Sequence, residues 1–470
     1  MTRAVRDTDH LTPIETLMWR LEADRSLSST FGSVTFLDRE PDPDRFRSRL
    51  AGAAARVKRL RQRIDTGGLP TTPPIWVDDP DFSLDHHLRW QRCPGAGTEQ
   101  DVLDLAAELV ATPFDPIQPL WTFVVVTGLE GGRAALVQRM HHAITDGKGG
   151  IRISEQFVDV EPEAAGPTPD PFNGADPPDP HPTWFERFVD TAVDRAQGLT
   201  GTATDAARWT AAGLRDPHRF GELGSDVLDT LRSLKRQVAV TERARSPVWS
   251  TRSLERGFVA GSVPFDPVRR TATDAGVSIN DVFVTATLRG VAAYHQAFDH
   301  PVPELRVAIP VSTRSDAAVG GNAFSPTRVV LASGDGLTAA AHLRAVATAL
   351  DQTKRERATG VIEPLAAVTE LVPAPLLRNA VRWQAATIDY TASNLRAAPF
   401  PLYIAGARIE ATYAIGPLAG TAANVTMMSY DGRVDVGVHV DAHAVSEPAL
   451  LRDTIIAAFH ELDAAVSALG

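Results

Sequence analysis

Runs of apolar residues with two different spacings follow each other along the chain and predict a mixed α/β protein. In the first third, residues 32–37, 121–129 and 133–140 are rich in β-branched and apolar residues, which favours strands. The turn residues 130–132 (EGG) separate the last two runs, so these runs predict a β-hairpin. The second strand of this hairpin leads directly into His141.

The second half repeats the mixture of strand-like and helix-like spacing. Strands are predicted at residues 258–263, 305–310, 407–414 and 433–440. Helices are predicted at residues 267–275, 279–298 and 337–358. A last amphipathic helix is predicted to begin at Ser446-Glu447-Pro448, which reads as a cap and a first turn.

An early helix combines an apolar stripe with a basic face. Its apolar residues recur at helical steps, namely Phe46, Leu50, Val57, Leu60 and Ile64. The other face carries Arg45, Arg47, Arg49, Arg56, Lys58, Arg59, Arg61 and Arg63. Such a stripe is either an ordinary solvated helix face or a surface for an anionic membrane or a cosubstrate phosphate, and both interpretations stay open.

A proline-rich segment divides the chain. Residues 161–183 contain eight prolines and predict a linker, and residues 184–240 then read as helices. A chain of 470 residues is too long for one ordinary core. We therefore expect an N-terminal domain at 1–160, a linker and helical crossover at 161–250, and a C-terminal domain at 251–470.

The composition excludes several classes of protein. Apolar residues make up 43% and charged residues 22% of the chain, as in globular proteins, and the net charge of −11 argues against general nucleic-acid binding. The single cysteine, Cys93, excludes an internal disulfide and suits a reducing compartment. The N-terminal residues do not resemble a signal peptide, and no run approaches the ~18–20 apolar residues of a membrane span. We therefore expect a cytoplasmic protein that meets lipids only from their surface.

The heptapeptide His141-His142-Ala143-Ile144-Thr145-Asp146-Gly147 is the strongest candidate for chemistry. It follows the second strand of the hairpin, so a histidine here projects into the space beyond a sheet. With an unperturbed pKa of ~6.5, histidine is a natural proton acceptor near neutral pH. Asp146 lies close enough in sequence to hold the loop or the imidazole. The pattern predicts a general base.

These histidines also allow structural and metal-binding interpretations. A lone histidine pair is more often structural than catalytic, and adjacent residues on extended chain point to opposite sides, so the pair does not favour a metal site. The chain lacks a GxSxG elbow and a paired reactive cysteine, which argues against a covalent acyl-enzyme. Direct transfer to an alcohol or amine is the simpler scheme. Packing roles are expected for Trp121, His86, His87, His439 and His443.

With its ordered motifs, the sequence resembles the bacterial wax ester synthase/diacylglycerol acyltransferase family, within the HHxxxDG acyltransferase superfamily. The resemblance runs from residue 11 to the C-terminal helix. Besides HHxxxDG, the matching segments are Leu11-Thr12-Pro13 with Leu17 and Trp19, residues 74–89, Pro119-Leu120-Trp121, residues 278–282 (SINDV), residues 310–314 (PVSTR) with Gly321-Asn322, and Ser393-Asn394. The chain departs from the family where VPGP is replaced by residues 395–399 (LRAAP), a change that bears on acceptor preference and tunnel shape.

The resemblance implies two chloramphenicol-acetyltransferase-like α/β domains, each a mixed sheet flanked by helices, with an interdomain tunnel. It implies that His142 is the general base, with His141 in support. Asp146 would orient the loop through an arginine or a backbone contact, and Gly147 would permit the turn. Asn280 and Asp281 match the second signature and would support substrate or transition state; helix capping is the alternative.

The implied reaction is acyl transfer from acyl-CoA to a lipid alcohol, most simply diacylglycerol, giving triacylglycerol, or a fatty alcohol, giving wax ester. No metal and no cofactor other than acyl-CoA as cosubstrate is expected. The enzyme would work at the inner face of the plasma membrane or at lipid inclusions. Two alternatives remain: a related enzyme that takes its acyl group from a carrier protein, and a non-catalytic lipid-binding relative.

Overall fold

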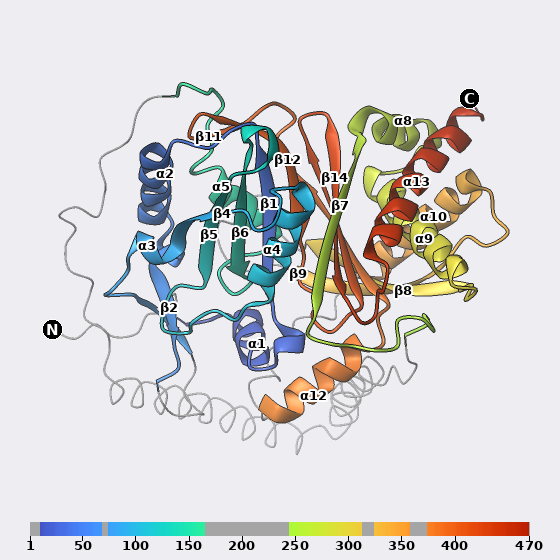
Figure 1. Cartoon of the computed structure of the whole chain (residues 1–470). Helices are drawn as coiled ribbons and strands as arrows, with labels where there is room; N and C mark the ends of the chain where they lie inside the picture. Colours follow the sequence, from blue (N-terminus) through green and yellow to red (C-terminus); the bar gives the residue numbers. More distant parts are fainter. Residues whose placement is uncertain (1–9, 68–73, 165–243, 313–323, 358–373, 470) are drawn as a thin grey trace, which may run out of the picture.

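The structure is a computed structural model, and it describes residues 10–67, 74–164, 244–312, 324–357 and 374–469. The described strands form two large mixed sheets, one in each half of the molecule, with helices packed around them (Figure 1). This confirms the mixed α/β class expected from the sequence.

The first sheet carries the histidine turn. Its strands, in spatial order, are β11 (Tyr403–Ile404), β12 (Ala407–Ile415), β1 (Thr30–Leu37), β6 (Ala134–His141), β5 (Trp121–Thr127) and β4 (Leu88–Arg92). Neighbours are antiparallel except β4 and β5, which run parallel. The predicted hairpin is thus confirmed as β5 and β6, with β6 ending at His141. A small separate sheet pairs β2 (Gln62–Asp65) with β3 (Ile75–Asp78).

The second sheet has a similar plan. Its strands, in spatial order, are β7 (Arg256–Pro264), β14 (Arg433–Asp441), β13 (Ala423–Tyr430), β10 (Tyr390–Arg396), β8 (Glu304–Ser312) and β9 (Phe324–Ala332). Here β10 runs parallel to both β13 and β8, and the other pairs are antiparallel. Three of the four strands predicted for the second half lie in this sheet, and the fourth, residues 407–414, is β12 of the first sheet.

Helices cover both sheets. Those of the first half are α1 (Pro13–Leu21), α2 (Pro43–Arg56), α3 (Leu84–His87), α4 (Glu99–Ala111) and α5 (Gly147–Ser154). Those of the second half are α8 (Phe265–Ala275), α9 (Ile279–Ala297), α10 (Ala339–Arg357), α12 (Ala374–Ala385) and α13 (Pro448–Ser467). Figure 1 shows α8, α9, α10 and α13 grouped beside the second sheet, and their apolar faces share one hydrophobic core with it.

Two sequence expectations need correction. The helix expected to reach Ile64 ends at Arg56, because Val57 adopts an extended conformation and the chain continues as a 3₁₀ turn (Lys58–Arg61) into β2. The apolar spacing resembles that of a helix because Leu60 is buried although it lies in the 3₁₀ turn, and Ile64 is buried although it lies in β2. At the last helix Pro448 does open the first turn, but the capping position is Glu447, and its side chain makes no capping hydrogen bond.

The second half contributes strands to the sheet of the first half. β11 and β12 come from the segment 251–470, yet β12 pairs with β1 over Gly32–Leu37. In return, Phe258 of β7 belongs to the same buried cluster as residues of α4, and the Gln100 amide donates to the Phe258 carbonyl at 3.2 Å. The sequence contains no signal that β12 joins the first sheet. Domain boundaries drawn along the chain therefore separate strands that share a sheet. The expected crossover at 184–240 and the Gly321-Asn322 motif lie outside the described residues.

Candidate active site

His141 is held rigidly at the end of β6. It pairs with Thr30 of β1, and its side chain is fully buried. Its Nδ1 atom accepts a hydrogen bond from the Ala143 backbone N–H at 3.0 Å, and its Nε2 atom lies 3.0 Å from Oε2 of Glu22. A backbone N–H can only donate, so Nδ1 carries no proton and Nε2 carries the donated one. Both nitrogens of His141 are therefore engaged, which agrees with the supporting role expected for this ring.

His142 is the neighbouring ring, and it is half-buried. Its backbone N–H donates to the Ser29 carbonyl at 3.1 Å, which ties it to the start of β1. The ring packs against Phe31, with 4.5 Å between the ring centroids. The pKa of His142 is lowered to about 4, first by burial and then by the neighbouring His141, while Asp146 and the Thr145 backbone oppose the shift. A neutral imidazole at this position can accept a proton at physiological pH.

Asp146 shapes the turn that carries His142. It is the N-cap of α5, and its Oδ1 atom accepts a hydrogen bond from the Gly149 N–H at 2.8 Å. This is the backbone contact expected for Asp146. A side chain at Gly149 would overlap the Thr145 hydroxyl, so the turn needs glycine there.

Gly147 has a different reason to be glycine from the one expected. It is the first residue of α5 and is not among the residues of positive φ, so the turn does not depend on its conformational freedom. A Cβ at Gly147 would instead lie 3.2 Å from Leu395 of β10. Gly147 therefore allows β10, a strand of the other sheet, to approach the start of α5.

Asn280 and Asp281 begin α9 in the second half. Ser278 is the N-cap, and Oδ2 of Asp281 accepts hydrogen bonds from the Ser278 backbone N–H at 2.9 Å and its hydroxyl at 2.7 Å. This capping box agrees with the alternative role for Asp281. Its buried Oδ1 atom has no hydrogen-bond partner among the described residues. A contact of Asn280 with substrate stays a prediction.

Glu22, at the C-cap of α1, is a site residue that the sequence analysis missed. Besides His141, its carboxylate accepts from the Ser28 hydroxyl at 2.7 Å and from the Ser29 N–H at 3.0 Å. Burial would raise the pKa of Glu22, but these donors and His141 lower it below its ordinary value. One charged carboxylate thus holds both His141, which precedes His142 in the chain, and Ser29, whose carbonyl accepts the His142 N–H. It lies 119 residues before His141, and no local pattern links the two.

The second half contains a counterpart of the histidine turn without its base. β13 and β14 form a hairpin that leads through a turn into α13, as β5 and β6 lead into α5. Asp441 occupies the position of His141: its carboxylate accepts the His443 N–H at 3.1 Å, and its carbonyl accepts the Ala444 N–H at 3.0 Å. The position equivalent to His142 is Ala442. The second turn therefore has no residue equivalent to the expected base, His142.

The other histidines and most of the basic face have structural partners. His87 stacks on Trp121 with 4.4 Å between centroids, and its Nδ1–H donates to the Trp121 carbonyl at 2.8 Å, so its packing role is confirmed. Arg45 and Arg49 both pair with Asp159, at 2.8 and 2.9 Å. These ion pairs agree with the interpretation of the basic stripe as an ordinary helix face.

Comparison with known proteins identifies the family. Residues 11–283 match the model of the wax ester synthase/diacylglycerol acyltransferase catalytic domain, and residues 320–463 match that of the C-terminal domain. The chain belongs to the wax ester synthase/diacylglycerol acyltransferase family. A Mycobacterium tuberculosis relative named as a diacylglycerol O-acyltransferase is 32% identical over 464 residues, covering 97% of this chain and 92% of the relative. A second one is 28% identical and covers 97% and 98%.

Solved structures confirm the two-domain fold of this family member. The wax ester synthase/diacylglycerol acyltransferase from Marinobacter aquaeolei VT8 matches with a TM-score of 0.65 at 20% identity, covering 98% of this chain and 100% of that one. The first condensation domain of the CDA synthetase matches with a TM-score of 0.58 at 16% identity, covering 98% and 97%. At these identities the likeness shows the fold alone.

Family membership makes the chain an acyltransferase, as the motifs predicted, and the alternatives of a carrier-protein donor or a non-catalytic relative are not favoured. Among the described residues, no helix combines the length and the apolar character needed to cross a membrane. The tunnel between the domains and the roles of the individual site residues stay predictions.

Proposed function

We propose that this protein transfers a long-chain acyl group from acyl-CoA to the hydroxyl of diacylglycerol, forming triacylglycerol, and that fatty alcohols serve as a second acceptor. The names of its relatives support the acceptor class. The observation that carries the proposal is the position of His142, a neutral imidazole beside a partner ring, His141, whose two nitrogens are both engaged.

In this scheme His142 acts on the acceptor. Its imidazole removes the hydroxyl proton while the oxygen attacks the carbonyl carbon of the thioester. The carbon–sulfur bond then breaks, and the leaving CoA thiolate takes the proton from His142, so the enzyme returns to its starting state. A base of low pKa forms an imidazolium that releases its proton readily to a thiolate. The reaction uses the two substrates and no further cofactor.

Purified protein supplied with acyl-CoA and diacylglycerol tests the proposal. His142→Ala should lower kcat by roughly 10²- to 10⁴-fold, the usual contribution of a general base, without changing the fold or the thermal transition. A variant that keeps a tenth of the activity would exclude His142 as the base. If the unsubstituted protein is inactive with acyl-CoA but active with an acylated carrier protein, the donor assignment is wrong.

We further propose that the enzyme works at a lipid surface. On α12 the side chains of Leu376 and Trp383 are 62% and 46% exposed, whereas Leu377 on the same helix is buried against Leu21 and Leu27. Leu376, Ala380 and Trp383 are spaced four and three residues apart, so they lie on one helix face. An exposed apolar stripe of this kind favours contact with a lipid interface.

Flotation with lipid droplets or anionic vesicles tests the lipid contact. Leu376→Ser with Trp383→Ser should reduce the bound fraction while leaving turnover of a short, water-soluble alcohol unchanged. The matched control replaces Ile117, an apolar residue that is 64% exposed but lies outside α12, with serine. Equal binding of both variants would rule out α12 as the contact.

A further inference from the structure

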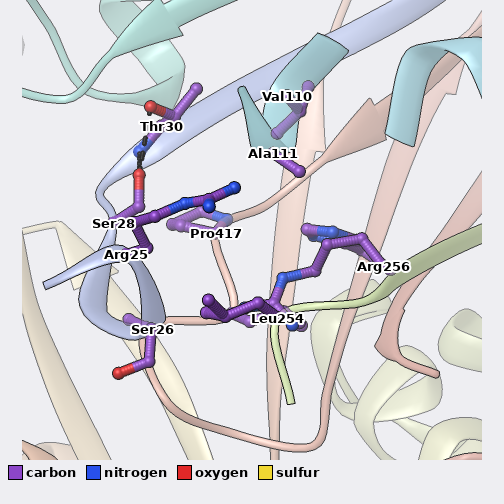
Figure 2. Close-up of a pocket in the computed structure, with 12 residues that line it drawn as sticks. Arg25, Ser26, Ser28, Thr30, Val110, Ala111, Leu254, Arg256 and Pro417 are labelled. Atoms are coloured by element: carbon purple, nitrogen blue, oxygen red, sulfur yellow. Dashed lines mark hydrogen bonds between the residues drawn. The ribbon is translucent and has the colours of Figure 1, made fainter. Parts of the chain in front are cut away.

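A polar pocket lies at the boundary between the two halves. Its lining includes Arg25 and Ser28 from the segment before β1, Arg256 at the first residue of β7, and His439 on β14. Figure 2 shows Arg25 and Arg256 on opposite sides of this pocket, carried by different chain segments. Both halves therefore contribute to one recess, and neither could form it alone.

The charges in this pocket suit an anion. Arg25 has no acidic partner among the described residues. Arg256 uses Nη1 for the Ser253 carbonyl at 3.0 Å and lies 3.5 Å from Asp441, but its Nε and Nη2 atoms have no hydrogen bond in the described part of the chain. Burial lowers the pKa of Arg256, the charge of Asp441 opposes this shift, and the positive charge of Arg25 adds to it, so the two guanidinium groups that line this pocket interact electrostatically. Paired guanidinium groups are typical phosphate ligands.

His439 adds a buried acceptor to the same pocket. It is 3% exposed, and its Nδ1 atom lies 2.8 Å from the Gly416 carbonyl. A carbonyl can only accept, so Nδ1 carries the proton and Nε2 presents a lone pair. That Nε2 atom is buried and has no partner among the described residues. A ligand that brings an N–H or O–H group would satisfy it, which removes an energetic penalty of burial.

The pocket is close to the histidine turn but not on the same face as His142. Thr30 lines the pocket, whereas its neighbour Phe31 packs on the His142 ring. Successive residues of a strand point to opposite faces, so β1 separates the pocket from the reacting centre. Ser28 joins the two regions, since its hydroxyl donates to Glu22, the partner of His141. An anion in this pocket would belong to a remote part of a substrate.

We propose that this pocket binds the phosphate groups of the acyl-CoA donor. The inference rests on the proposed function. The charges of the two substrates decide which of them fits this pocket. Diacylglycerol and fatty alcohols have no charge, whereas acyl-CoA bears phosphates far from its reacting thioester, together with amide and hydroxyl groups that can donate to His439. Arg25 and Arg256 thus anchor the donor from both halves, and this fixes its approach to the histidine turn.

Steady-state kinetics with two acyl donors test the site. Arg25→Gln and Arg256→Gln should each raise KM for acyl-CoA by about tenfold, the effect of one charge-assisted contact, with kcat unchanged. With an acyl-pantetheine, which lacks phosphate, both variants should equal the unsubstituted enzyme. The control is Arg269→Gln, an exposed arginine on α8 paired with Asp266. Inorganic pyrophosphate should compete with acyl-CoA in the unsubstituted enzyme and lose potency in both pocket variants.

The outcomes separate this inference from the proposed function. If the unsubstituted enzyme does not use acyl-CoA, the proposed function fails. If it does, and both pocket variants keep KM for acyl-CoA within twofold, the pocket proposal alone is wrong. It is also wrong if the variants lose binding to phosphatidylglycerol vesicles while KM stays unchanged, since the pocket then serves lipid headgroups. Arg25 is exposed, so its substitution cannot act by unfolding the protein.

Discussion

Glu22 distinguishes the two histidines of the pair, because it contacts the ring of His141. Its carboxylate accepts three hydrogen bonds, from His141, Ser28 and Ser29. The hydrogen bond to His141 fixes that ring in one tautomer, which favours His142 as the base. The bond to Ser29 fixes the carbonyl group that holds the backbone of His142. Glu22 is therefore a positioning residue, because its carboxylate contacts Ser28, Ser29 and His141.

Two substitutions at Glu22 separate geometry from charge. Glu22→Ala leaves His141 without its acceptor and should lower kcat on the order of 10²-fold with little change in KM, since misplacement of a catalytic group has this effect. Glu22→Gln should stay within several-fold of normal kcat, because an amide can accept from His141 and donate to Ser28. The exposed carboxylate of Glu108 provides the control, Glu108→Ala. An equal loss in the Gln and Ala variants would show that the negative charge itself is required.

At this scale, the sequence identified the residues within one turn and missed those brought in from elsewhere. His141, His142 and Asp146 are neighbours in sequence, so their spacing alone predicted that they act together. Glu22 and Leu395 reach the turn only through tertiary packing. The same limit applies to Gly147, whose lack of a side chain is explained by contact with Leu395 and not by its own conformation.

The element that carries the chemistry is the turn between β6 and α5, and its shape depends on Gly149. The N–H of Gly149 completes the helix cap with Asp146, while its missing side chain leaves room for the Thr145 hydroxyl. Gly149→Ala forces these groups apart. We expect about 1 kcal/mol of lost stability from the broken cap, together with a loss of kcat as His142 shifts.

A second substitution shows whether this clash is the cause. Thr145→Ala removes the hydroxyl that the new methyl group would overlap, so the double variant Gly149→Ala/Thr145→Ala should recover most of the kcat and stability lost by Gly149→Ala. Thermal unfolding and steady-state kinetics of the two single variants and the double variant measure both effects. If the double variant is as impaired as Gly149→Ala alone, the clash is not the reason for the glycine.

Element types were predictable where apolar spacing was long and capped by recognisable residues. α9 begins at its Ser278–Asp281 capping box, and the hairpin of β5 and β6 follows its glycine turn. The end of α2 was not predictable, because the 3₁₀ turn and the short strand β2 that follow it bury apolar residues at nearly helical steps. The pairing of β12 with β1 joins residues more than 370 positions apart, which no local pattern encodes.

At the scale of the whole molecule, the second half contributes two strands to the sheet of the first half, and only the first half carries the histidine pair. Strands β11 and β12 join the first sheet, and Gln100 of α4 contacts Phe258 of β7. These contacts fix the halves relative to each other. The seam then holds the pocket of Arg25, Arg256 and His439. Because the second turn carries Asp441 and Ala442 where the first carries His141 and His142, a donor bound at this seam has a single base to approach.

Buried histidines should make the stability of the molecule fall in acid. Burial lowers the pKa of His87 and of His439 to about 4. In the unfolded chain histidine takes up a proton near pH ~6.5, so between pH 6.5 and 4 the unfolded state binds protons that the native state refuses. Stability is therefore intact above pH 6.5 and declines as the pH falls. Each histidine should remove about 2 kcal/mol between pH 7 and pH 5.

Denaturant unfolding at pH 7 and pH 5 measures this difference. His87→Gln should reduce the loss of unfolding free energy between the two pH values by about 2 kcal/mol, even though the variant is less stable at pH 7, because it removes one of the groups that protonate on unfolding. His86→Gln, at the exposed neighbouring position, should leave the loss unchanged. Burial raises the pKa of Asp389 and of Asp435, and these carboxyls oppose the trend, because the native state takes up their protons before the unfolded chain does as the pH falls. An unchanged pH dependence in His87→Gln would show that the native protein protonates His87 as readily as the unfolded chain does.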